Sequence, residues 1–278
     1  MHEIGIVDTR NIINAIAEKY SYDFSDYALI SFKRRIDSIL VQFNLKYPDL
    51  LVNKLLGNKA FFDQFLDILA VPSTEMFRDP AVWRILRDEL IQDLLNEGAG
   101  FKIWLPNSVS GDELFSLAIM LKEMDLLKTA QILVSSMSNK SIENIKSGIF
   151  SNGKLDISTD NYIRANGEFD LSKYLISKDG NMYRDVTLIE NVSFFRQNSF
   201  LEPAPPGVKL IMFRNKMIYF NQTLQGRILK TLYNSMSPNG LLVIGAKESI
   251  NNYYGNNEFY QISKTESIYK PKVLCIKQ

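Results

Sequence analysis

The first third of the chain has the hydrophobic pattern of a group of helices. Apolar residues recur every three or four positions, for example at Ile12, Ile13 and Ile16, and glycine is almost absent. This spacing places apolar side chains on one face of a helix. Residues 1–95 are therefore predicted to form an N-terminal helical domain that ends in a linker helix.

After about residue 96 the pattern changes to short apolar runs that alternate with helical segments. The runs Phe101–Leu105, Ala130–Val134 and Leu210–Phe213 have the length and composition of buried strands. Helices are predicted at 112–121 and 141–147. A repeated order of strand, loop and helix is typical of a parallel sheet with crossover helices. Residues 96–278 are therefore predicted to form an α/β domain.

A different pattern interrupts this domain between Tyr162 and Phe195. Aromatic and apolar residues alternate there with polar ones, and Asn166-Gly167 and Asp179-Gly180 are dipeptides that favour hairpin turns. A small antiparallel β subdomain is therefore predicted over residues 162–195. Further on, closing strands that include an antiparallel pair are predicted at 240–244, 258–262 and 267–269.

The composition excludes several classes of protein. Of the 278 residues, 46% are hydrophobic and 23% are charged, as in an average globular protein. The formal net charge of +1 gives no overall attraction to nucleic acid or to an anionic membrane. No apolar run approaches the roughly 20 residues that span a bilayer, and residues 1–10 lack a signal-peptide pattern. A cytoplasmic protein without membrane insertion is expected. The single Cys275 and single His2 predict neither an internal disulfide nor a zinc site.

The first candidate site is the loop Pro106–Glu113 after the first predicted strand. In open α/β sheets, ligands bind where strands end and helices begin. Nucleotide-binding loops usually contain several glycines, whereas this loop has only Gly111. On its own, the loop favours a structural interpretation in which Ser110 caps the helix and Asp112 and Glu113 complement the helix dipole.

Two further segments, Thr74–Pro80 and Phe213–Phe220, carry candidate residues. Arg78 in the first is suited to bidentate binding of a ligand carboxylate, and a surface ion pair with an adjacent acidic residue is the alternative. The second segment is a strand end followed by an aromatic turn. For Tyr219 and Phe220, a role in the core and a role in the site are equally open.

Together these segments resemble the motifs of the chemotaxis receptor O-methyltransferase family, CheR. Thr74–Pro80 is similar to the family's threonine before Phe-Phe-Arg-Asp/Glu-Pro. Ser110–Ala118 is similar to Ser-Thr-Gly-Glu-Glu-Pro-Tyr-Ser, and Arg214–Phe220 is similar to Arg-Asn-Val-Leu-Ile-Tyr-Phe. The resemblance extends over almost the whole chain. The family's helical domain is resembled by Asp23–Tyr27 and Lys33–Ile36, and its closing strand and turn by Ser237–Leu241, Gly245 and Glu248.

The resemblance implies a helical domain followed by a Rossmann-like S-adenosylmethionine-dependent methyltransferase domain. The implied activity is transfer of a methyl group from S-adenosylmethionine to glutamate side chains of chemoreceptors, with S-adenosylhomocysteine as the other product. The implied catalytic residues are Arg78, at the methionine end of the cofactor, and Tyr219, beside the transferred methyl. The implied cofactor-binding residues are Thr74, Arg78, Asp112, Glu113, Ser136, Asn198, Ser199, Asn215 and Lys216.

Two positions depart from the family pattern. Pro106–Val109 replaces small residues, and Ser136 stands where the second strand should end in an acid that binds the ribose hydroxyls. Loss of one charge-assisted hydrogen bond of roughly 1.5–3 kcal/mol weakens binding about tenfold to a hundredfold. An alternative function is therefore a CheR-like module with weakened or lost catalysis that binds a receptor or signalling partner. A small-molecule methyltransferase is less favoured, since the helical domain would then lack a role.

The basic triplet Lys33, Arg34 and Arg35 has two interpretations. A cluster of charges on a helix is usually a solvated face, whereas the family resemblance implies contact with the acidic methylation region of a chemoreceptor. The antiparallel insertion is where some family members dock a receptor tail by strand addition. A monomer without a nucleic-acid partner or a metal is expected.

Overall fold

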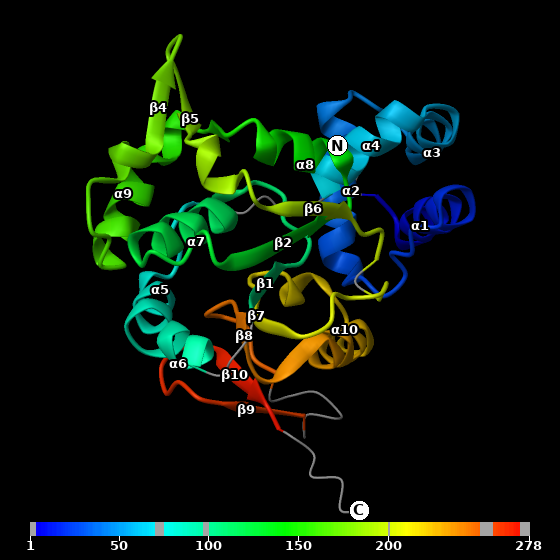
Figure 1. Cartoon of the computed structure of the whole chain (residues 1–278). Coiled ribbons are helices and arrows are strands. Elements are labelled where there is room, and N and C mark those ends of the chain that lie inside the picture. Colours follow the sequence, from blue (N-terminus) through cyan, green and yellow to red (C-terminus); the bar gives the residue numbers. More distant parts are fainter. Residues whose placement is uncertain (1–3, 70–74, 97–99, 200, 251–257, 273–278) are drawn as a thin grey trace, which may run out of the picture.

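The structure is a computed structural model that describes residues 4–69, 75–96, 100–199, 201–250 and 258–272 (Figure 1). A group of N-terminal helices lies beside a larger part in which helices flank a twisted sheet. Within the described ranges, no helix has both the length and the apolar character needed to cross a bilayer.

The N-terminal helices share one apolar core. They are α1 (Ile6–Tyr20), α2 (Leu29–Gln42), α3 (Pro48–Gly57) and α4 (Lys59–Leu69). Their buried faces meet through residues at helical spacing, including Ile12 and Ile16 of α1 and Phe32 and Ile36 of α2. Pro48 occupies the first turn of α3, where a missing N–H breaks no helical hydrogen bond. The helical prediction for this region is confirmed.

The next helical stretch packs with the sheet rather than with these helices. It consists of α5 (Pro80–Ile85), a π-helical turn η1 (Leu86–Leu90) and α6 (Ile91–Asn96). Trp83, Leu86 and Leu94 are buried in the core that covers one face of the sheet. The linker helix of the predicted first domain therefore contributes its apolar side chains to the core of the second.

The main sheet has the order β6-β2-β1-β7-β8-β10-β9 among the described strands. Its strands are β1 (Phe101–Leu105), β2 (Ala130–Ser136), β6 (Ser193–Arg196), β7 (Val208–Phe213), β8 (Met236–Ile244), β9 (Phe259–Gln261) and β10 (Ile268–Pro271). The five strands from β6 to β8 are parallel to their neighbours, and β10 and β9 complete the sheet as an antiparallel pair. The predicted parallel sheet and antiparallel closure are confirmed.

Helices cover both faces of this sheet because alternate strand residues point in opposite directions. Ile103 and Leu105 of β1 join the core under α7 (Asp112–Glu123), and Trp104 joins the core on the other face, under α10 (Gln222–Ser235). The helix α8 (Asn139–Lys146) follows β2. Each crossover helix starts beyond the carboxyl end of a parallel strand, so the connecting loops gather at one edge of the sheet.

The antiparallel subdomain is smaller than predicted and begins earlier in the chain. It contains β3 (Ile149–Phe150), β5 (Asn181–Arg184) and β4 (Leu175–Lys178) in the order β3-β5-β4. The hairpin at Asp179-Gly180 is confirmed. Phe194 and Phe195, which were assigned to this subdomain, instead lie in β6 and pair in parallel with β2.

The turn predicted at Asn166-Gly167 is also wrong as a hairpin. These residues end the helix α9 (Leu155–Arg164), where Asn166 has the left-handed conformation common after a helix, with φ of 59°. A Cβ on Gly167 would lie 2.2 Å from the ring of Tyr162, so only glycine fits this close approach. The same dipeptide serves a helix terminus as well as a hairpin, and the local sequence did not distinguish the two.

Candidate active site

A cavity of about 260 Å³ lies at the edge of the sheet where β1, β7 and β8 end. Its lining comes from the segment before α5, Trp83 of α5, the loop after β1, the turn after β7 and the residues after β8. Ligands of open α/β sheets bind outside the carboxyl ends of the strands. Its charged lining residues are Glu75, Arg78, Glu113, Arg214, Lys216, Lys247 and Glu248.

The loop after β1 turns sharply into α7. Asn107 and Gly111 both have positive φ, at 49° and 77°. Gly111 is the residue that precedes the helix, and it has no side chain to cap the first turn. Ser110 lies one residue before this position, and its Oγ accepts a long hydrogen bond of 3.4 Å from the Asp112 N–H and donates to the Asp112 carboxylate at 3.0 Å. The predicted capping by Ser110 is therefore confirmed for one N–H of the first turn, although Ser110 is not the N-cap residue.

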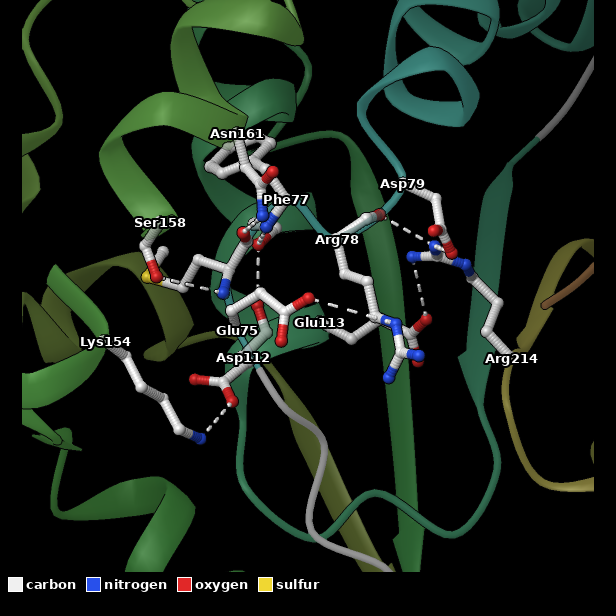
Figure 2. Close-up of polar contacts among 12 residues, drawn as sticks. Glu75, Phe77, Arg78, Asp79, Asp112, Glu113, Lys154, Ser158, Asn161 and Arg214 are labelled. Carbon is white, nitrogen blue, oxygen red and sulfur yellow. Dashed lines mark hydrogen bonds and ion pairs between the residues drawn. The ribbon is translucent and has the colours of Figure 1, made fainter. Parts of the chain in front are cut away.

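Arg214 connects the end of β7 to the segment before α5, and it was not among the predicted site residues. Its side chain is buried, and its Nη2 donates to the Arg78 carbonyl at 2.7 Å and to Asp79 Oδ2 at 2.8 Å. Its Nη1 lies 3.5 Å from Glu113 Oε1. Figure 2 shows Arg214 between Asp79 and Glu113. The sequence feature that could have identified Arg214 as a site residue is its position directly after the apolar run of β7.

Glu113 and Asp112 point in different directions from the start of α7 (Figure 2). Glu113 lines the cavity, where it is near Arg214 and lies 3.9 Å from Lys216 Nζ. Asp112 is fully buried away from the cavity, and it forms ion pairs with Arg184 of β5 and with Lys154. Of these two predicted residues, only Glu113 faces the cavity.

Arg78 is partly exposed at the cavity wall, with a side chain 34% accessible and an ion pair to Glu75 at 3.9 Å. Its backbone carbonyl accepts hydrogen bonds from Trp83 Nε1 at 2.9 Å and from Arg214. The backbone is thus held from two directions while the guanidinium remains at the cavity. Thr74, also predicted to bind the cofactor, lies outside the described residues.

Glu248 holds the turn after β7 in place, and it too was not among the predicted site residues. This buried carboxylate accepts hydrogen bonds from the backbone N–H groups of Gly245, Asn215 and Met217 at 2.7 to 2.8 Å. A Cβ on Gly245 would lie 2.6 Å from Asn215 Nδ2, so glycine is required there. The glutamate and glycine together fix Asn215 and Lys216, both predicted site residues, at the cavity wall.

Lys216 is partly buried, with a side chain that is 14% exposed, and desolvation lowers the pKa of its ammonium group. The negative charges of Glu113 and Glu248 act in the opposite direction, and Arg214 reinforces the lowering. Lys216 lines both the main cavity and a smaller cavity of about 40 Å³ beneath the N-terminal helices.

Tyr219 also lines both cavities and is held by the N-terminal helices. It ends the short 3-10 turn η5 (Met217–Tyr219), and its carbonyl accepts from the Ala28 N–H at 2.8 Å. The guanidinium of Arg35 lies 4.5 Å from the centre of its ring and donates to the Leu69 carbonyl. In the basic triplet, Arg34 is exposed, whereas Arg35 is directed inward to Tyr219. The triplet is therefore not a single solvated face.

The remaining predicted residues do not line the main cavity. Ser136, at the end of β2, is only 1% exposed. Asn198 and Ser199 line a separate pocket against the N-terminal helices. The Tyr22 hydroxyl is 2.8 Å from Asn198 Oδ1 and 3.0 Å from the Met137 carbonyl, and it accepts from Arg196 Nε at 3.1 Å. Tyr22 thus forms a hydrogen bond with the side-chain oxygen of Asn198, a residue that was predicted to bind the cofactor.

We expect Tyr22→Phe to lower the free energy of unfolding by about 1 kcal/mol, because it removes the hydrogen bonds between this hydroxyl and the partly buried Met137 carbonyl and Asn198 side chain. Chemical denaturation monitored by circular dichroism measures this change. Tyr260→Phe, at a tyrosine that is 47% exposed, is the matched control and is expected to change stability by under about 0.5 kcal/mol. Equal effects of the two substitutions would contradict the contact at Asn198.

Comparison with known proteins finds a matching family model and similar sequences. The family model described as CheR methyltransferase, SAM binding domain, matches residues 72–268. A Pseudomonas putida protein named Cher3 is 33% identical over 264 residues, which cover 95% of this chain and 96% of that protein. A chemotaxis protein methyltransferase of Vibrio parahaemolyticus is 27% identical over 226 residues, covering 78% and 80% of the two chains.

Two solved methyltransferase structures are similar to this chain at low sequence identity and low TM-score. The rRNA methyltransferase aviRa of Streptomyces viridochromogenes is 11% identical, with a TM-score of 0.39 and coverage of 73% of this chain and 87% of that one. The amino pentose methyltransferase CalS10 of Micromonospora echinaspora, solved with bound SAM, is 6% identical with a TM-score of 0.35, covering 62% and 53%.

Proposed function

Because the chain belongs to the CheR methyltransferase family, we propose that it transfers a methyl group from S-adenosylmethionine to glutamate side chains of chemoreceptors. The observation that carries the proposal is the cavity at the carboxyl ends of β1, β7 and β8, which brings Arg78, Glu113, Asn215 and Tyr219 together from segments far apart in the sequence. The names of the chemotaxis methyltransferase relatives support the receptor as substrate.

The cavity residues fit the methionine end of S-adenosylmethionine. That end carries a carboxylate and an ammonium group, and the cavity presents the Arg78 guanidinium beside the carboxylates of Glu75 and Glu113. Arg78 would hold the carboxylate as a fork, Glu113 would bind the ammonium group, and Asn215 would contact the nucleoside. When bound, S-adenosylmethionine supplies a methyl group on a positively charged sulfur, and transfer to a carboxylate leaves S-adenosylhomocysteine and a methyl ester.

The residues of this chain would act by alignment. A glutamate acceptor is already ionised near neutral pH, so the site needs no strong base to activate it. The η5 turn that carries Tyr219 is held by Glu248 from one side and by the Ala28 N–H from the other. A fixed wall of this kind favours transfer by holding the reacting atoms in line.

A second candidate function is a receptor-binding module without turnover. It is favoured by the buried Ser136, in place of an acid, and by the contact of Tyr22 with Asn198. The nucleoside end of the cofactor is still predicted to contact Ser136, Asn198 and Ser199. The second candidate function requires that these residues do not bind it. Exposed Arg34, with Lys33 beside it in α2, is proposed to meet the acidic receptor helices in either case.

Calorimetry with S-adenosylhomocysteine and a methyl-transfer assay test the proposal. We expect binding at micromolar ligand and base-labile incorporation of labelled methyl into cytoplasmic chemoreceptor fragments that contain glutamate, but not into the same fragments with glutamine at those positions. No binding heat at millimolar S-adenosylhomocysteine would reject the enzyme. Binding of a receptor fragment with no label transferred would support the second candidate.

A further inference from the structure

The smaller cavity, between the N-terminal helices and the α/β part, is lined by positively charged but not by negatively charged described residues. Its volume of about 40 Å³ accommodates about three water-sized groups, since each requires roughly 10–15 Å³. Phe24, Leu66 and Leu69 make one side apolar, and Arg35 and Lys216 bring two cations to it. None of the described residues that line this cavity is acidic.

Both cations are held in place by neighbouring groups. Arg35 donates to the Leu69 carbonyl and stacks on the Tyr219 ring, and Lys216 lies 3.9 Å from Glu113, which faces the main cavity. Burial lowers the pKa of both side chains, because desolvation disfavours their charged forms. An anion placed between two partly desolvated cations would stabilise both charges.

The two cavities meet at a common wall formed by Asn107, Val109, Lys216 and Tyr219. The main cavity is lined by three carboxylates and four cationic side chains, whereas the smaller one has cations and no carboxylate among its described lining residues. The mixed charge of the main cavity suits the methyl carrier, which bears both signs of charge, and a negatively charged group is favoured in the smaller cavity.

We propose that the smaller cavity binds the carboxylate of the methyl acceptor, and that Lys216 makes the site selective for an anionic acceptor. The volume suits a carboxylate with one methylene group, which is the end of a glutamate side chain. The inference rests on the proposed function, because it places the methyl carrier in the main cavity. The family resemblance assigned Lys216 to the cofactor, whereas its position on the common wall favours the acceptor.

Lys216→Met tests the proposal because methionine keeps the length and apolar stem of lysine without its charge. With the protein saturated by S-adenosylhomocysteine, binding of N-acetylglutamate amide and of the uncharged N-acetylglutamine amide is measured by NMR titration. We expect wild type to prefer the glutamate probe and Lys216→Met to bind it about tenfold to a hundredfold more weakly, the loss of one charge-assisted hydrogen bond. The glutamine probe should bind both proteins equally.

Lys46→Met, at an exposed lysine, controls for the loss of one positive charge and should leave both probe affinities unchanged. Calorimetry should give Lys216→Met an affinity for S-adenosylhomocysteine within about twofold of wild type. Equal binding of the two probes by wild type, or an unchanged glutamate affinity in Lys216→Met, would overturn the inference while leaving the proposed function intact. Loss of S-adenosylhomocysteine affinity in Lys216→Met would show that Lys216 binds the cofactor, and this result would also overturn the inference. A wild-type protein that does not bind S-adenosylhomocysteine would remove the proposed function and this inference together.

Discussion

Asp112→Ala is expected to lower the free energy of unfolding by about 3–5 kcal/mol, the cost of removing one partner from a buried ion pair. The Asp112 carboxylate is fully buried and pairs with Arg184, whose side chain is 4% exposed, and with Lys154 at 3.5 Å. Without it, the Arg184 guanidinium keeps its bond to the Ile149 carbonyl and its contacts with aromatic rings, but its charge is uncompensated. Denaturant unfolding followed by circular dichroism measures the loss.

A double variant separates the ion pair from general damage to the core. Asp112→Leu combined with Arg184→Met replaces both charges with apolar groups, and buried pairs replaced in this way often recover most of the lost stability. Asp93→Ala, at an exposed aspartate in α6, is the matched control and should change stability by under about 0.5 kcal/mol. An Asp112→Ala variant within 1 kcal/mol of wild type would show that this contact does not hold α7 to the antiparallel sheet.

The same ion pair shows why the site was only partly predictable. Asp112 and Glu113 are adjacent acids at the start of α7, and helical geometry alone turns them about 100° apart. Which one faces a ligand depends on where β5 and Lys154 lie, and Arg184 is 72 residues away in the sequence. The sequence therefore predicted the pair but did not choose between them. The contact between Tyr22 and Asn198 spans 176 residues, and no local sequence pattern predicted it.

The fold was predicted more completely because its signals are local. The buried parallel strands β1, β2 and β7 coincide with short apolar runs, and the helices keep their apolar residues at helical spacing. The strand β8 begins at Met236, before the apolar run predicted at 240–244. The errors arose where one local signal suits two structures. Asn166-Gly167 fits a helix terminus as well as a hairpin, and the aromatic run at Phe194-Phe195 fits a parallel strand as well as an antiparallel one. Packing across the sheet decides such cases.

Among the residues of the main cavity, Arg78 should have the largest effect on cofactor binding. We expect Arg78→Ala to weaken S-adenosylhomocysteine binding by at least about a hundredfold, because it removes two charge-assisted hydrogen bonds of roughly 1.5–3 kcal/mol each to the cofactor carboxylate. The fold should be retained, since the bonds from Trp83 and Arg214 end on the Arg78 backbone carbonyl, which alanine keeps. Isothermal calorimetry measures the affinity, and thermal unfolding confirms that the variant is folded.

Arg78→Lys keeps the charge but loses the planar fork, so its affinity should lie between those of wild type and Arg78→Ala. Arg164→Ala is the matched control, because the Arg164 side chain is exposed and its carbonyl, which accepts from Arg84, is unchanged by the substitution. It should bind S-adenosylhomocysteine as wild type does. An affinity of Arg78→Ala within about threefold of wild type would place the cofactor carboxylate elsewhere, because the ion pair with Glu75 would then account for the position of Arg78 without any ligand.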